Sequence, residues 1–189
     1  MFDIDFTDET IDIEDGILHR GVITLGGKME DFSSSLSYWS KDDYRQQWLE
    51  AATCLLEPDA RSAFITNIHD PQSAKFIRWW PAWRSGDFVV LQEQFLPLDI
   101  NFFEDADIDV DEELKARISK FSIENPYLAV GDRLATHCQE CQKTGICRRP
   151  RLGKHTSVMD DIEICPSEWG VQLYLMEEFI DRRKIDWTK

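Results

Sequence analysis

The clearest periodicity in the chain is helical and begins at Ser40. Ser40 is placed to cap a helix, and Asp43 stands three residues later, where an acid can complete a capping box. Apolar side chains then follow at helical spacing, at Tyr44, Trp48, Ala51, Ala52, Leu55 and Leu56. The pattern predicts an amphipathic helix from Asp42 to Glu57, because Pro58 disfavours helix in the residue before it. Aromatics on such a face are typical of core packing, so the helix indicates a fold and no chemistry.

Alternation with a period of two precedes this helix. Residues 1–15 interleave acids with Ile4, Phe6, Ile11 and Ile13, which predicts an edge strand or an extended arm whose acids face water. Segments 17–25 and 28–39 have the composition of strands, and Gly26-Gly27 between them favours a tight turn. A hairpin is therefore expected to lead into the helix.

Three further β segments follow the helix, at 62–68, 74–84 and 87–96. Turn residues separate them, which favours an antiparallel meander packed on the helix. Pro81 must mark a bulge, an edge or a strand end, because it offers no N–H to a ladder. Trp79 and Trp80 are adjacent and must face opposite ways, so one of them is expected at a second layer or at an exposed contact.

The remaining pattern completes an α+β fold: an antiparallel sheet packed against an amphipathic helix, with a C-terminal cysteine-containing elaboration. A helix is predicted near 111–121, a last strand at 168–174 and a short helix at 176–184. The length of 189 residues suits one domain over 1–189, with its core in 1–100 and a cysteine-bearing insertion at 135–166. There is no apolar run long enough for a membrane span, and the acidic N-terminus is unlike a signal peptide, so we expect a cytoplasmic protein.

The net charge of −15, with a sequence pI near 4.6, argues against free nucleic acid as a direct partner. It fits either a merely soluble acidic protein or a surface that recruits a basic protein. Charge complementarity can raise association rates from roughly 10⁵–10⁶ to about 10⁸–10⁹ M⁻¹s⁻¹.

A second acidic run lies between Leu98 and Glu113. It combines acids with two phenylalanines: Asp99, Phe102, Phe103, Glu104, Asp105, Asp107, Asp109 and Asp111. Such a run is either a solvated loop leading into the next helix or a partner-facing patch, in which the rings are anchors among charges. A calcium loop is not favoured, because neither glycine at the sixth position nor glutamate at the twelfth follows Asp105.

Four of the five cysteines gather in the C-terminal half, at Cys138, Cys141, Cys147 and Cys165. The first two are separated by two residues, and thiolates at such spacing can share a structural zinc ion, with His137 or His155 as a substitute ligand. A redox dithiol is the alternative, although no thioredoxin-like βαβ pattern surrounds the pair. Metalloprotease, deaminase, phosphate-loop and nucleophile-elbow motifs are absent from the sequence, which favours a binding protein over an enzyme.

A resemblance adds to these patterns. It rests on Leu36-Ser37-Tyr38-Trp39-Ser40, Asp42-Asp43-Tyr44 and Gln47-Trp48, followed by 63–66, Asp70-Pro71, Phe76 to Trp80, Gly86-Asp87 and the later Glu168-Trp169. These motifs, over about 18–98 and 169–180, resemble the N-terminal domain of contact-dependent growth inhibition immunity proteins of the CdiI type. The resemblance implies a cytoplasmic antitoxin that binds the C-terminal toxin domain of a cell-surface effector, often a nuclease, through a scaffold with no catalytic residues.

Three functions are therefore compared. The favoured hypothesis is immunity by tight 1:1 binding of a basic toxin domain, with the acids and phenylalanines of 99–111 as the contact and no required cofactor. A zinc-containing interaction module without toxin neutralisation is the alternative. A small metal- or thiol-dependent enzyme is the third, and it would require reactive thiols at Cys138 and Cys141.

Overall fold

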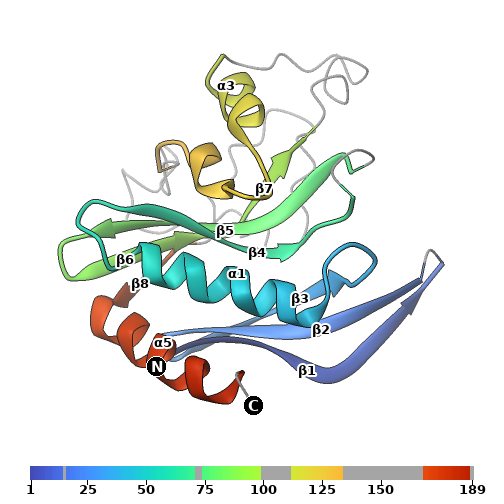
Figure 1. Cartoon of the computed structure of the whole chain (residues 1–189), viewed down its shortest axis with the longest axis horizontal. Helices are drawn as coiled ribbons and strands as arrows, with labels where there is room; N and C mark the ends of the chain where they lie inside the picture. The colour runs from blue at the N-terminus through green and yellow to red at the C-terminus, as the bar shows by residue number, and fades with distance from the viewer. Residues whose placement is uncertain (15, 71–73, 99–111, 134–167, 188–189) are drawn as a thin grey trace, which may run out of the picture.

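The computed structural model describes residues 1–14, 16–70, 74–98, 112–133 and 168–187, without the side chains of 113 and 114. The described elements are, in chain order, β1 (Phe2–Ile13), β2 (Gly16–Leu25), β3 (Lys28–Ser35), α1 (Lys41–Cys54), β4 (Arg61–Asn67), β5 (Phe76–Ser85), β6 (Phe88–Gln92), β7 (Gln94–Pro97), α3 (Glu112–Lys120), the 3-10 helix η1 (Pro126–Ala129), β8 (Glu168–Gln172) and α5 (Leu173–Asp186). The α+β class is confirmed, with two antiparallel sheets where one was expected (Figure 1). The predicted cysteine-bearing elaboration lies outside the described residues.

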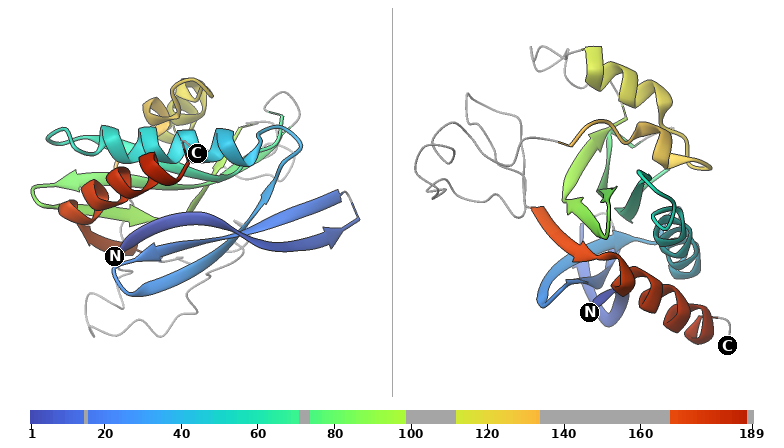
Figure 2. Two further views of the ribbon diagram at one scale, coloured as in Figure 1. Left: turned by 60° about the horizontal axis from the view of Figure 1, so that its bottom comes forward. Right: turned by 90° about the vertical axis from the view of Figure 1, so that its left-hand side faces the viewer.

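The first sheet has the order β1-β2-β3, with both pairs antiparallel. The predicted turn between β2 and β3 is confirmed: Gly26 and Gly27 have φ values of 68° and 135°, which side chains other than glycine rarely adopt. The strand expected over 28–39 ends earlier, at Ser35. The N-terminal alternation is confirmed as a strand, and its far half pairs only with β2 and projects from the molecule (Figures 1 and 2).

The capping prediction for α1 is confirmed. Ser40 Oγ accepts from the Asp43 N–H at 3.2 Å, and Asp43 Oδ2 accepts from the Ser40 N–H at 2.8 Å. The predicted end near Glu57 is wrong, because the helix ends at Cys54. The N–H groups of Leu56 and Glu57 donate to carbonyls three residues earlier, so the chain tightens out of the α-helix before Pro58 is reached.

The buried face of α1 covers the open edge of β4. The Gln47 amide donates to Ala63 O at 2.7 Å and accepts from Ile65 N–H at 3.0 Å, as a neighbouring strand would. Trp48 Nε1 donates to Ile65 O at 2.7 Å, and the Tyr44 hydroxyl accepts from Ile68 N–H at 3.0 Å. Side chains of the helix thus satisfy backbone groups of the edge, which protects it from pairing with another chain.

The second sheet has the order β4-β5-β6-β8, with β7 also beside β5. The strand expected over 87–96 is split at Glu93, so that β6 pairs with 82–85 and β7 with 76–79 of β5. Pro81 lies opposite the break between these two ladders, where a missing N–H costs least. The proline is therefore in the body of a central strand, beside an interruption in its neighbours.

Both faces of the second sheet are covered, so Trp79 and Trp80 are both buried. The Trp80 ring lies 5.0 Å from Trp169 of β8. On the face of Trp79, Trp83 Nε1 donates to Gly131 O just after η1, and Arg117 of α3 donates to Gln94. The expected second layer is confirmed for one of the two rings, and an exposed contact is excluded for both.

The C-terminal elements return to the core. The helix predicted near 111–121 is α3, the predicted last strand is β8, and the closing helix is longer than expected and begins directly after β8. One apolar cluster includes residues from β1, α1, both sheets and α5. Among the described residues, no helix is both long and apolar enough to cross a membrane.

Candidate partner-binding surface

All of the predicted site residues lie outside the described residues. This applies to the proposed contact at Asp99, Phe102, Phe103, Glu104, Asp105, Asp107, Asp109 and Asp111, and to Cys138, Cys141, Cys147 and Cys165. In the described part of the chain, no three His, Cys, Asp or Glu side chains are grouped as metal ligands. The described cysteine, Cys54, is half-buried, and burial raises the pKa of its thiol, which disfavours the reactive thiolate.

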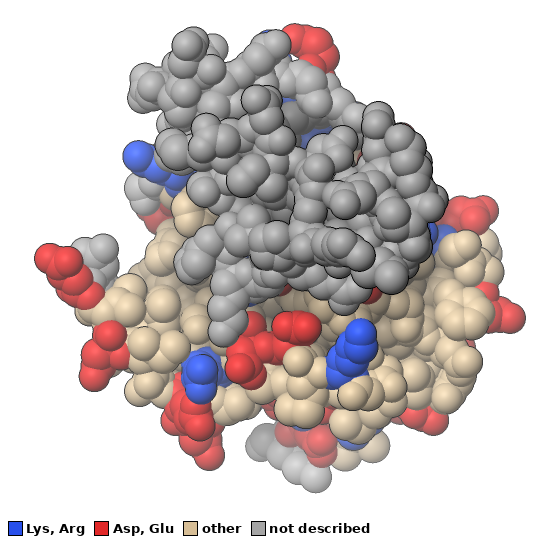
Figure 3. All heavy atoms as spheres, turned by 180° about the vertical axis from the view of Figure 1, so that it is seen from behind, with Lys and Arg blue, Asp and Glu red and all other residues tan. Residues whose placement is uncertain are grey.

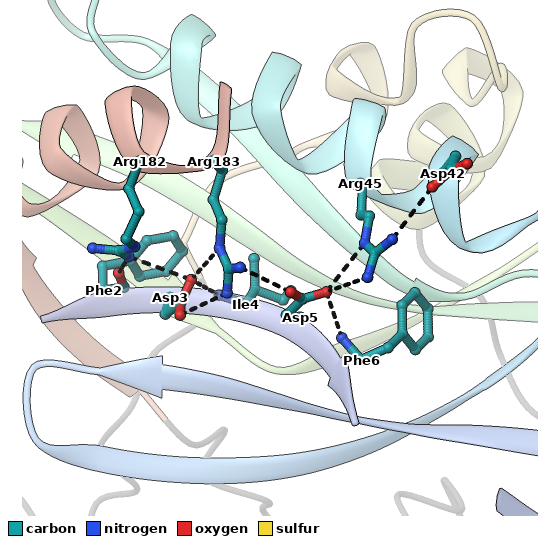
Figure 4. Close-up of polar contacts among 9 residues, drawn as sticks. All are labelled: Phe2, Asp3, Ile4, Asp5, Phe6, Asp42, Arg45, Arg182 and Arg183. Atoms are coloured by element: carbon teal, nitrogen blue, oxygen red, sulfur yellow. Dashed lines mark hydrogen bonds and ion pairs between the residues drawn. The ribbon is translucent and has the colours of Figure 1, made fainter. Parts of the chain in front are cut away.

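The acids of the β1–β2 hairpin form two groups. The first group, near the N-terminus, is neutralised by arginines of the protein itself. Asp3 accepts a two-pronged contact from Arg183 of α5, at 2.9 and 2.7 Å, and Arg182 adds a contact of 3.4 Å (Figure 4). Asp5 accepts from Arg183 at 2.8 Å and from Arg45 of α1 at 3.1 Å. Two carboxylates on one strand are thus held by three guanidinium groups on two helices.

Trp187 extends this ion-pair cluster at the end of α5. The guanidinium carbons of Arg45 and Arg183 lie 5.6 and 5.1 Å from the centre of a Trp187 ring, within the range of cation–π attraction. The Arg183 side chain is only 13% exposed, so water screens its contacts weakly. The cluster joins β1, α1 and α5, and its acids are not available to attract a partner.

The second group of acids lies on the far half of the β1–β2 hairpin. Asp8, Asp12 and Glu14 are exposed, and within the described residues no ion pair joins them to a basic side chain. Glu9 pairs with Arg20 at 2.8 Å. Figure 3 shows acidic side chains along this projection, at the left of that view, with uncharged atoms between them. These acids can act on a partner, because their field reaches water without an internal counter-charge.

A shallow depression of about 210 Å³ lies between β4 and α3, and most of the charged side chains that line it are basic. Arg61, Arg117 and Lys120 contribute to its lining. Arg61 pairs with Asp132 at 2.9 Å, and Arg117 donates to Ala129 O and to Gln94 Oε1, so two of the three cations serve the fold. The depression is therefore a weak candidate for ligand binding.

Sequence reasoning found part of this arrangement. The alternation of residues 1–15 correctly placed acids on a strand facing water. It missed that Asp3 and Asp5 form ion pairs with arginines of the same protein. The available signal was the Arg182-Arg183 pair in the closing helix, although its partner lies some 180 residues earlier and no local pattern connects the two.

Comparison with known proteins identifies the scaffold. The family model described as the CdiI N-terminal domain matches residues 34–179. "Immunity protein CdiI" of Enterobacter cloacae subsp. cloacae is 25% identical over 99 residues, which cover 52% of this chain and 68% of that protein. The fold matches a chain of the CdiA-CT/CdiI toxin and immunity complex from Enterobacter cloacae with a TM-score of 0.69, at 20% identity, over 98% of this chain and 99% of the other. The chain belongs to the CdiI N-terminal domain family.

Proposed function

We propose that this protein is an immunity protein that binds the C-terminal toxin domain of a contact-dependent growth inhibition effector and blocks it. The observation that carries the proposal is the family match over 34–179, supported by a fold shared with a chain of a toxin and immunity complex. The proposed role is stoichiometric inhibition in the cytoplasm, with one immunity protein for each toxin domain and no catalysis.

The chemistry of the toxin is a finer part of the proposal. A nuclease presents a basic cleft to phosphates, and an acidic protein competes for the same cations. The net charge of −15 suits such a competitor. Neutralisation also requires that almost no toxin stays free, which corresponds to a Kd on the order of nanomolar or below.

Co-expression tests the proposal. The chain is expressed with the C-terminal domain encoded by the gene immediately upstream, and growth is scored with and without it. We expect growth arrest by the domain alone, rescue by this chain, and a complex that associates more slowly at high salt. A toxic neighbour that is not neutralised would overturn the proposal for that pair.

The predicted contact at 99–111 remains a proposal within this function. Charge reversal at Asp105, Asp107 and Asp109 is expected to slow association and flatten its salt dependence. Unchanged kinetics would remove this run from the interface.

Structural zinc at Cys138, Cys141, Cys147 and Cys165 is likewise proposed from their spacing alone. Native mass spectrometry of the purified protein tests it. One bound zinc ion that is lost when two of these cysteines become serine supports the site, and a metal-free mass of the wild-type protein contradicts it.

A further inference from the structure

The far half of the β1–β2 hairpin extends past the end of β3. The ladder between β2 and β3 ends at the pair Leu18 and Ser35, so beyond Leu18 the hairpin is a two-stranded ribbon. We call residues 8–18 of this hairpin, apart from 15, the ribbon; its two-stranded outer part runs from Asp12 to Ile17. Figures 1 and 2 show it projecting beyond the sheets and helices. A register shift in β1 between Phe6 and Thr10 lies at its base, and such bulges redirect a strand.

The ribbon exposes three isoleucines. Ile11, Ile13 and Ile17 are 36%, 44% and 56% exposed. Since paired residues share a face, Ile11 and Ile13 lie on the face of Leu18, and Ile17 lies on the opposite face with Asp12. Threonine would provide the same β-branched strand preference without exposed apolar surface, so strand formation alone does not account for isoleucine.

Acids surround these isoleucines. Asp8, Asp12 and Glu14 are exposed on the ribbon, so it combines apolar anchors with a negative surround. Interfaces draw most of their affinity from such central apolar anchors and much of their association rate from charged surroundings. The acids also oppose pairing of the ribbon with a second copy of itself, because like charges would meet.

The ribbon lies outside the region that the family model matches. The family model matches from residue 34, so it leaves out β1, β2 and most of β3. The N-terminal half of β1 is tied to the helices by ion pairs, whereas the ribbon makes no such tie in the described structure except Glu9 to Arg20 within the hairpin. The family match therefore does not account for the exposed isoleucines of this hairpin.

We propose that the ribbon is a docking arm for the toxin domain, and that its isoleucines enter an apolar groove bordered by basic side chains. This inference rests on the proposed function and names the surface through which it operates. The acids bring the arm to the basic rim of the groove, and burial of Ile11, Ile13 and Ile17 then holds the complex together.

The test uses the full-length protein and a catalytically inactive form of the toxin domain encoded upstream. The variant Ile11→Thr/Ile13→Thr/Ile17→Thr keeps the β-branched side chains and removes the apolar anchors. We expect its Kd to rise about 30-fold or more, mainly through faster dissociation, with unchanged thermal unfolding. Ile185→Thr, at a residue of α5 that is 61% exposed, is the control and should bind as the wild type does.

A second pair of variants tests the charges. Asp8→Asn/Asp12→Asn/Glu14→Gln on the ribbon and Glu177→Gln/Glu178→Gln/Asp181→Asn on the exposed face of α5 remove the same number of acids. Overall charge changes equally, so only position distinguishes them. We expect the ribbon variant to associate about 10-fold more slowly at low salt, the α5 variant to change far less, and the difference to shrink at high salt.

The outcomes separate the two proposals. If the wild-type chain does not bind the toxin domain, the proposed function fails. If the wild type binds and the ribbon variants bind equally well, or the ribbon and α5 variants weaken binding equally, the docking arm is overturned while immunity stands. Sedimentation of the wild-type chain alone tests whether the ribbon instead binds a second copy of this chain. A dimer that the isoleucine variant converts to monomer would show this and would overturn the docking arm.

Discussion

The two halves of β1 have the same alternation of acids and apolar residues and opposite surroundings. In residues 2–6, the apolar side chains enter the core, and the two acids are neutralised by arginines from α1 and α5. In residues 8–13, the isoleucines are exposed, and Asp8 and Asp12 face water on a ribbon supported only by β2. The first half closes the fold, and the second half is free to meet a partner.

The difference shows that an alternating pattern specifies a strand without specifying what covers it. A strand needs a second layer before its apolar face contributes its full burial free energy. Near the N-terminus, α1, α5 and β4 provide that layer. Farther along, the strand has passed beyond those elements, so the same residue types become surface. Four predictions test this contrast, in decreasing order of the free-energy change expected.

Substitution of one apolar residue in each half of β1 should give the largest difference in the free energy of unfolding. Phe2 is fully buried, with its ring 5.4 Å from Phe64 and 5.1 Å from Phe179, so Phe2→Ala is expected to lower the free energy of unfolding by about 3–5 kcal/mol. Ile13→Ala should change it by no more than about 0.5 kcal/mol. Urea unfolding of both variants provides the measurement, and equal losses would contradict the division of β1.

The next largest contrast is expected from removal of the arginine that pairs with the acids of each half of β1. Arg183→Met leaves Asp3 and Asp5 short of a partly buried counter-charge and should cost about 2–4 kcal/mol. Arg20→Met breaks an exposed pair with Glu9 and should change stability little, because water and salt screen such pairs. Thermal unfolding at two salt concentrations tests both, because a loss for Arg183→Met that disappears at high salt would indicate a screened surface contact instead.

Gly21 lies near the base of the ribbon, where the two halves meet. It pairs with Phe6 and Phe32, and a Cβ atom there would stand 2.2 Å from the Phe32 ring. Gly21→Ala is therefore expected to cost about 1–3 kcal/mol through displacement of that ring. The double variant with Phe32→Leu should show a loss smaller than the sum of the two single losses, and strict additivity would mean that the ring is not the obstacle.

The smallest effect is expected at the start of α1, the helix from which Arg45 pairs with Asp5. Ser40→Ala should lower the free energy of unfolding by about 1 kcal/mol at neutral pH. The hydrogen bonds from Ser40 lower the pKa of Asp43, because they stabilise its charged carboxylate. Their contribution to the free energy of unfolding is therefore complete above the ordinary aspartate pKa of about 3.9, and it is lost as pH falls through the lower pKa of Asp43 in the folded protein.

The difference between the wild type and Ser40→Ala should accordingly shrink on acidification below about pH 4. Hydrogen exchange provides the regional control for this prediction. Amides of residues 2–6 should exchange faster in the variant, and those of the ribbon should not change. A gap that widens in acid would contradict the capping interpretation.

Predictions from sequence succeeded where the signal was local. The cap at Ser40, the Gly26-Gly27 turn and the alternation of β1 each involve residues within a few positions of one another. They failed where distant segments decide the outcome. The strand over 87–96 is divided because its two parts pair with different stretches of β5.

For the partner surface, the sequence indicated an acidic protein and placed its contact at 99–111, which stays a prediction. It did not separate the acids that hold the fold together from those left on the surface. That separation required Arg45, Arg182 and Arg183 to be placed in space, because Coulomb attraction depends on distance and burial and not on order along the chain.

The fold class, the net charge, the family resemblance and most of the helices and strands could be read from the sequence, since each follows from neighbouring residues or from composition. Three features required the folded protein: which aromatic rings are buried, the cover of α1 side chains over the edge of β4, and the neutralisation of one half of β1 while the other projects. The reason is that burial and ion pairing arise from segments far apart in the chain, which only the folded protein brings within contact distance.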